Sequence, residues 1–112
     1  MSSELASITL QRLLDEGQFA VFELPVRTAF VQAIRTSNGN LLIEFSRADP
    51  ALESLLQRLG QVSTNELGFP KVVSDRGNDA ACGEVVAQAL AVLANSVGCE
   101  NVCRVRTGTS KP

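Results

Sequence analysis

The chain has 112 residues, 45% of them hydrophobic, and its 10 basic and 12 acidic side chains give a net charge of −2. That length is enough for one domain with its own core, and the lack of a basic cluster interleaved with aromatic residues excludes a typical nucleic-acid surface. The sequence also contains no histidine, which excludes Ser-His-Asp and Cys-His catalytic arrangements and imidazole metal sites.

Residues 3–16 are predicted to form the first helix. Ser3 is a favourable N-cap residue, apolar side chains recur after it at helical spacing, and Gly17 ends the pattern. The sequence starts without a positively charged leader, and no apolar run approaches the roughly 18–20 residues that a membrane span requires. We therefore expect a soluble cytoplasmic protein that does not bind a membrane.

Three strands of one antiparallel sheet are predicted next, from "FAVFELPV", "TAFVQAIR" and "NLLIEF". A two-residue turn at 26–27 would join the first two strands, and Asn38-Gly39 is typical of a type I′ turn between the second and third. This pairing assigns the side chains to two faces. One face carries Phe19, Val21, Glu23, Phe30, Gln32, Ile34, Leu41, Ile43 and Phe45, and the other carries Ala20, Phe22, Leu24, Val31, Ala33, Arg35, Leu42 and Glu44.

The predicted pairing limits what the acidic side chains on the sheet can do. Glu23 and Glu44 fall on opposite faces, so they cannot form the acid and base pair that glycoside hydrolysis needs. Glu44 lies diagonally across from Arg35, which predicts a cross-strand ion pair worth about 0.2–1 kcal/mol. No catalytic residue is therefore predicted on the sheet.

Both predicted faces of the sheet are largely apolar, so both require cover. We expect the two later helices to cover one face and the first helix to cover only part of the other. The remaining apolar surface would include Phe22, Leu24, Val31 and Leu42, and exposed patches of this kind usually mark interfaces. The sequence therefore predicts a homodimer that pairs through these residues and leaves a sheet face or edge for another polypeptide.

Asp49-Pro50 predicts the start of a second helix, with the aspartate as N-cap and the proline in the first turn. Apolar residues keep a helical period over 52–67, so the helix is predicted to run through this range with a weak point at Gly60. Gly68 in a left-handed conformation and Pro70, which cannot continue a helix, then predict its end. A third helix is predicted over 79–97, followed by a strand over 101–106 and a flexible tail over 107–112.

Three cysteines and one acidic loop are the candidate metal ligands. Cys82, Cys99 and Cys103 are one ligand short of a structural zinc site. In an extended chain Cys99 and Cys103 would lie about 13 Å apart, beyond the ~7 Å limit for a disulfide. Asp75, Asn78 and Asp79 lie in a loop that lacks the calcium-loop spacing, and helix capping explains them better. We therefore predict three free thiols, no metal and no cofactor.

The predicted order is α-β-β-β-α-α-β, an α+β domain over 1–106 with an antiparallel sheet of three or more strands. The segments "FVQAIRTSNGNLLIEFS", "LLQRLGQVSTNELGFPKV" and "AACGEVVAQALAVLANSVG" carry a resemblance to the small bacterial domains of the type III secretion chaperones. The resemblance implies a homodimeric, non-catalytic domain that binds another polypeptide. It implies no catalytic residues.

Three functions remain open from the sequence. The first is the chaperone-like protein-binding domain just described. The second is an immunity or antitoxin-like protein that neutralises one toxin by masking its site. The third is a small metabolite-binding domain or enzyme, which a deep pocket lined with Arg35, Arg47 or Glu44 would favour.

Overall fold

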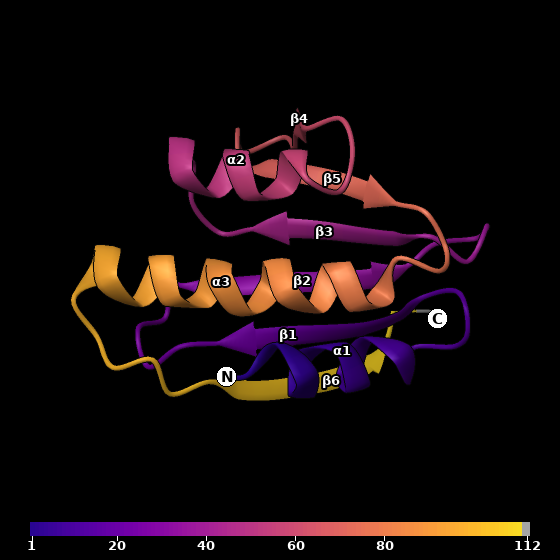
Figure 1. Ribbon diagram of the computed structural model, residues 1–112, viewed down its shortest axis with the longest axis horizontal. Helices are drawn as coiled ribbons and strands as arrows, with labels where there is room; N and C mark the ends of the chain where they lie inside the picture. Colours follow the sequence, from indigo (N-terminus) through magenta and orange to yellow (C-terminus); the bar gives the residue numbers. More distant parts are fainter. Residues whose placement is uncertain (111–112) are drawn as a thin grey trace.

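Residues 1–110 are described by a computed structural model, which has an α+β fold built on one antiparallel sheet. Within this range the sheet has six strands in the order β4-β5-β3-β2-β1-β6 (Figure 1). The strands are β1 Gln18–Glu23, β2 Phe30–Arg35, β3 Leu41–Phe45, β4 Ser63–Thr64, β5 Pro70–Ser74 and β6 Arg104–Thr109, and the helices are α1 Ser3–Gln11, α2 Pro50–Gln57 and α3 Asp79–Val97. The predicted fold class, an antiparallel sheet with an N-terminal helix and two later helices, is confirmed.

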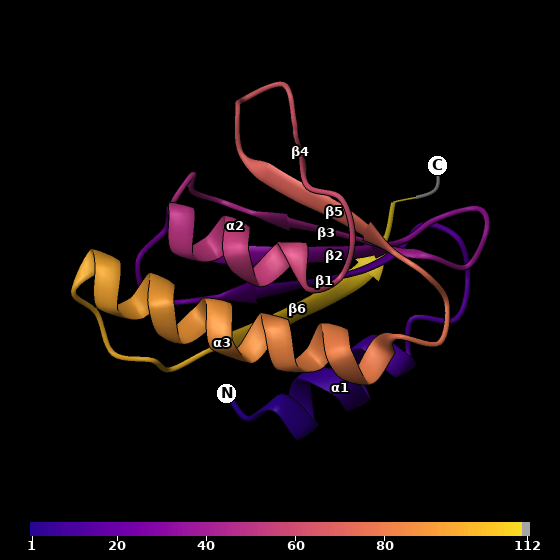
Figure 2. The same cartoon turned by 45° about the horizontal axis from the view of Figure 1, so that its top comes forward.

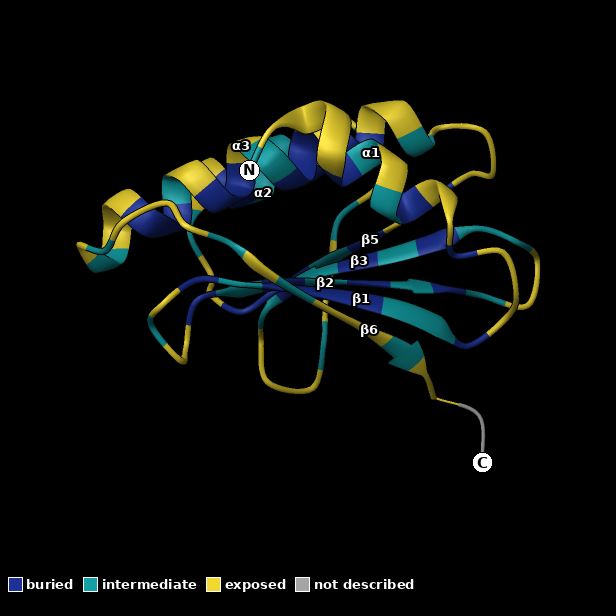
Figure 3. Cartoon of the chain, turned by 90° about the horizontal axis from the view of Figure 1, so that it is seen from below, coloured by how far each residue is buried: buried dark blue, intermediate teal, exposed yellow. Residues whose placement is uncertain are grey.

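The three described helices all lie on the same face of the sheet (Figure 3). Our expectation that α1 would cover part of the other face is wrong, because α1 packs against α3 through Ala6 and Leu10, which are fully buried. Gly83 makes this close approach possible, since a Cβ there would lie 2.7 Å from the Ser7 backbone nitrogen and 2.8 Å from its Cα. The opposite face of the sheet, here called the open face, has no described helix over it.

The first hairpin has the predicted register, with Phe19 opposite Ile34. The second hairpin is shifted by one residue from the prediction, so that Arg35 lies opposite Leu41. The loop is one residue longer than a type I′ turn, with Gly39 at φ 79° as its left-handed residue, whereas Asn38 does not have a positive φ. Because successive strand residues point to opposite faces, this shift moves every β3 side chain to the other face.

The structure corrects the predicted interface, because the helices cover the face of β1 and β2 that was expected to stay partly open (Figure 3). Phe22 and Val31 are fully buried and Leu24 is 6% exposed, all beneath the helices in the core of a single chain. Side chains buried in this way are not available to a second copy. Leu42 is instead on the open face, opposite Ile34, and is partly exposed. The predicted group is therefore divided between the core and the open face.

Helix α1 ends earlier than the predicted 16 and begins after Ser2, rather than Ser3, as its N-cap. The Leu14 and Asp15 backbone nitrogens donate to Gln18 Oε1 at 2.6 and 2.9 Å instead of to helical carbonyls. The carbonyl of Leu10, which would continue the helix, accepts from a side chain of the sheet. These hydrogen bonds compete with the helical ones and stop α1 within the apolar run.

Helix α2 begins as predicted, with Asp49 Oδ1 accepting from the Ala51 nitrogen at 2.8 Å, but it ends at Gln57 and not at 67. The segment after Gly60 contains the β4–β5 hairpin. Gly68, at φ 82°, closes that hairpin and does not terminate a helix, and Pro70 opens β5. The leucine spacing was misleading here, because the β-branched residues Val62 and Thr64 favour an extended chain.

Helix α3 has the predicted range, and Gly98, at φ 70°, is its C-cap. It is long and apolar enough by composition to cross a membrane, which was not expected, but its apolar stripe faces the sheet and forms part of the core. The compact globular fold is consistent with a soluble protein. Strand β6 begins three residues later than predicted and includes Thr107–Thr109 of the expected tail. Residues 111 and 112 lie outside the described range.

We predict that Gly68→Val destabilises the protein by about 1–2 kcal/mol, because a β-branched residue is strained at positive φ. A Cβ at Gly68 would meet no atom within 4 Å, so the loss reports backbone strain alone. Urea denaturation measures the change. Leu67→Val, at the neighbouring position where the side chain is 77% exposed, is the control and should change stability little. Equal stability of the two variants would contradict the assignment of the turn.

Candidate functional site

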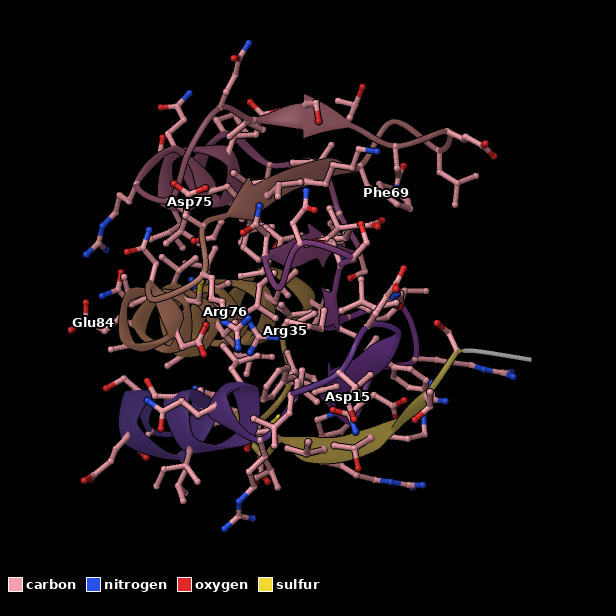
Figure 4. The ribbon with its side chains drawn as sticks, turned by 90° about the vertical axis from the view of Figure 1, so that its right-hand side faces the viewer. Asp15, Arg35, Phe69, Asp75, Arg76 and Glu84 are labelled. Carbon is pink, nitrogen blue, oxygen red and sulfur yellow. The ribbon has the colours of Figure 1, made fainter. Side chains whose placement is uncertain are left out.

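Arg35 was a candidate ligand-binding residue, but the structure gives it a structural role. Its side chain is 6% exposed and lies between α1, α3 and the β2–β3 loop (Figure 4). The guanidinium group donates to the carbonyls of Leu10 at 3.0 Å, Leu13 at 2.6 Å and Gly39 at 2.9 Å. It also donates to both carboxylate oxygens of Asp79, at 3.4 and 3.2 Å. Since an arginine side chain has five N–H donors, none remains for a ligand.

These contacts also correct the predicted pair of Arg35 with Glu44. The shifted register of β3 places Glu44 on the open face, where its carboxylate accepts a hydrogen bond from Asn65 Nδ2 at 3.1 Å. Asp79, which sequence spacing suggested as a capping residue, instead pairs with Arg35. Asn78 precedes α3 without a side-chain capping bond. Among residues 1–110 no group of three or more side chains could hold a metal ion.

We predict that Arg35→Met destabilises the protein by about 3–5 kcal/mol, the usual cost of breaking a buried ion pair. The matched control is Arg58→Met, because Arg58 pairs with Glu84 at 3.8 Å and both side chains are half exposed or more. Exposed pairs of this kind contribute less than about 1 kcal/mol. Thermal and urea denaturation of both variants measure the difference. If the two substitutions cost the same, the five contacts of Arg35 do not hold the helices on the sheet.

The open face carries a continuous apolar row across four strands. Phe19 of β1 lies opposite Ile34 of β2, which lies opposite Leu42 of β3, which lies opposite Val73 of β5. The first three side chains are partly exposed and Val73 is 52% exposed. We call these four residues the apolar row. A depression of about 390 Å³ lies at its Ile34 and Leu42 positions and is also lined by Gly17 and Thr36.

The apolar row extends to the edge of the sheet through a glycine. Gly108 of β6 lies opposite Phe19, and a Cβ at Gly108 would be 2.8 Å from Phe19 Cζ. The ring therefore lies against the glycine backbone, an arrangement that compensates for a missing side chain in an edge strand. No side chain of β6 interrupts the row at this position.

A polar row lies parallel to the apolar row, two residues along each strand. It consists of Arg106, Val21, Gln32, Glu44 and Lys71, which lie opposite one another in that order. Val21 is its one apolar member and is 5% exposed. Glu23, two residues beyond Val21 on β1, pairs with Arg106, with 3.1 Å between Glu23 Oε1 and the arginine Nε. The open face thus presents an apolar row beside a row that carries both signs of charge.

Glu23 and Glu44 lie on the same face, contrary to the prediction. They are two strands apart and two residues out of step, which is about 12 Å by sheet spacing. This exceeds the separation of the two carboxylates in glycoside hydrolases. Each carboxylate also has its own partner, Arg106 for Glu23 and Asn65 for Glu44.

The β4–β5 hairpin tip stands beside the open face and projects away from the helices (Figure 2). Asn65 builds the tip, since its Oδ1 accepts from the Leu67 and Phe69 nitrogens at 2.9 and 3.0 Å. Its Nδ2 donates to Glu44 and so ties the tip to the polar row. Leu67 at the tip is largely exposed. The sequence interpretation missed this hairpin, although an asparagine followed three residues later by glycine is a turn signal.

The three cysteines are free, as predicted. Cys82 is fully buried in α3, and burial raises the pKa of its thiol although a contact with the Ser74 hydroxyl acts in the opposite direction. Burial likewise raises the pKa of the Cys103 thiol. Both shifts favour the thiol over the nucleophilic thiolate at neutral pH. The structure thus gives neither cysteine an activated thiol.

Comparisons with protein-family models, with curated proteins and with solved structures found no match for this chain. The resemblance to type III secretion chaperones therefore stays a prediction. The candidate site rests on the geometry of the open face alone. Of the residues predicted to line an interface, only Leu42 lies there, and Phe19, Ile34 and Val73 were not among them.

Proposed function

We propose that this protein is a non-catalytic, chaperone-like protein-binding domain that works in the cytoplasm. The observation that carries the proposal is the apolar row, which crosses four strands on a sheet face that no described helix covers. A sheet face that is only solvated usually carries polar side chains, whereas a contiguous apolar patch usually marks an interface. Of the three candidate side chains for a metabolite site, Arg35 is fully used by structural contacts, Glu44 accepts a hydrogen bond from Asn65, and Arg47 is exposed.

The occupant we propose for the open face is a second copy of the chain. A two-fold interface uses the same patch on both partners, so the patch must be complementary to itself. The open face meets this condition, because its apolar row can pack on the same row of another copy. The polar row supplies Lys71 beside Glu44 and so offers both charges to a partner with the same pattern. Such a homodimer leaves the sheet edges free for another polypeptide.

We predict that the wild-type protein is a dimer at micromolar concentration and that Val73→Arg makes it monomeric. Val73 is 52% exposed, so the arginine is tolerated in the folded monomer but places a charge at the β5 end of the apolar row, within the proposed contact. Sedimentation velocity or light scattering measures the mass. Val102→Arg introduces the same side chain at a position that is 61% exposed and outside the open face, and it should remain dimeric. A monomeric wild type, or a folded dimeric Val73→Arg, would exclude this interface.

A further inference from the structure

Strand β6 forms one edge of the sheet, and its outer side has no neighbouring strand among residues 1–110. The Ser110 nitrogen donates to the Gly17 carbonyl at 2.8 Å. Along β6, every second residue forms its backbone hydrogen bonds with β1, and the residues between direct theirs to the other side. Residues 108 and 106 lie two and four residues before Ser110, so they also direct their backbone N–H and C=O groups to β1. Val105, Thr107 and Thr109 therefore direct their N–H and C=O groups outward, where an added strand would meet them.

A groove runs along this edge beneath α1. It has a volume of about 400 Å³ and is lined by Thr9 of α1, by Arg12 and Leu13 just after that helix, and by Val105, Thr107 and Thr109 of β6. Leu5, which is 57% exposed, lies four residues before Thr9 and therefore on the same side of α1. The side chains of an added strand would enter this groove at every second position, because directly paired residues point to the same face.

The charges around the edge are mainly positive, although the whole chain is acidic. Arg104 and Arg106 are exposed on the open-face side of β6, and Arg12 lines the groove on the helix side. Glu23 offsets one of these charges through its pair with Arg106. Residues of an added strand opposite Arg104 and Arg106 would point to the same side as these arginines. Carboxylates at those positions would pair with the arginines.

From these observations we infer that the β6 edge binds an extended acidic polypeptide segment as a seventh strand. The segment carries glutamate or aspartate at the positions beside Arg104 and Arg106 and β-branched residues at the positions that enter the groove. Backbone hydrogen bonds to Val105, Thr107 and Thr109 give affinity, and the alternating side chains give specificity. The inference deepens the proposed protein-binding function by naming the chemistry of a partner. It uses the outer edge of β6 and not the apolar row, although Arg106 also belongs to the polar row of the open face.

A second copy of the chain is a poorer occupant of this edge. Antiparallel pairing of two β6 strands would bring Arg104 and Arg106 of both copies to the same seam. Like charges that face each other across strands are destabilising. Charged edge strands of this kind usually prevent self-association. The edge therefore favours a partner of opposite charge.

The test uses a fluorescein-labelled peptide Thr-Glu-Val-Glu-Val-Glu-Thr and fluorescence anisotropy with the whole chain. The wild-type protein should bind this peptide, and the matched peptide with lysine in place of each glutamate should bind about tenfold more weakly. Thr107→Pro removes one outward N–H while sparing the β1 ladder, and should weaken binding about tenfold or more. Thr107→Ala keeps the N–H and should bind like the wild type.

A second measurement is independent of how well the proline variant folds. Peptides N-methylated only on the amides that face β6 should lose binding to the wild-type protein, whereas peptides methylated on the other amides should bind. Equal binding of the acidic and basic peptides, no binding of the acidic peptide, or unchanged binding by folded Thr107→Pro would each overturn the inference. So would a wild-type dimer that Thr107→Pro makes monomeric, because the edge would then be occupied by a second copy.

The two proposals fail separately. A monomeric wild type that binds the acidic peptide would contradict the homodimer and support the edge site. A second result would do the reverse. If the wild type is dimeric, Val73→Arg is monomeric and the wild type does not bind the acidic peptide, the homodimer is supported and the edge site is contradicted.

Discussion

The buried guanidinium group of Arg35 connects the parts of this fold that no strand pairing connects. Its five N–H donors all bond to protein oxygens, five oxygens from four residues, so none is left to bond to water. Two of these are carbonyls at the end of α1, one lies in the β2–β3 loop, and the carboxylate belongs to the first residue of α3. The helix positions relative to the sheet depend on this contact. Arg35 thereby ties the end of α1 and the start of α3 to the covered face of the sheet.

The sequence predicted correctly those elements in which one hydrophobic pattern, helical spacing or strand alternation, continues from end to end. The third helix has an uninterrupted apolar stripe and a terminal glycine, and its range was correct. The first hairpin has alternating residues on both strands, and its register was correct. In contrast, the leucines of 52–67 suggested one long helix, although the segment after Gly60 folds as a hairpin. Helical spacing and strand alternation are hard to separate in so short a segment.

The candidate site was predicted less well than the fold, for two reasons. The described helices all cover the face that carries Phe22, Leu24 and Val31 (Figure 3), and one extra loop residue turns β3 over. The β2–β3 loop contains three residues between Thr36 and Asn40 instead of two, with Gly39 in the left-handed conformation. That single extra residue reverses the faces of β3. Ile43 and Phe45 now share the core face with Ala33 and Val31, and Leu42 and Glu44 lie on the open face with Ile34 and Gln32. No pattern in the sequence revealed that Arg35 would be buried, because a charged side chain is expected at the surface unless its partners are known.

The position of β6 has a consequence for the order in which the sheet is completed. Strand β1 pairs on one side with β2, its neighbour in sequence, and on the other side with β6, whose Thr109 lies opposite Gln18. The hairpin closes a short loop, whereas the β1–β6 ladder requires nearly the whole chain to be present and costs more chain entropy. On a ribosome, the β1–β2–β3 meander can therefore form before β6 is synthesised. During that interval the edge of β1 is itself unpaired, and it stays open to other extended segments until β6 pairs with it.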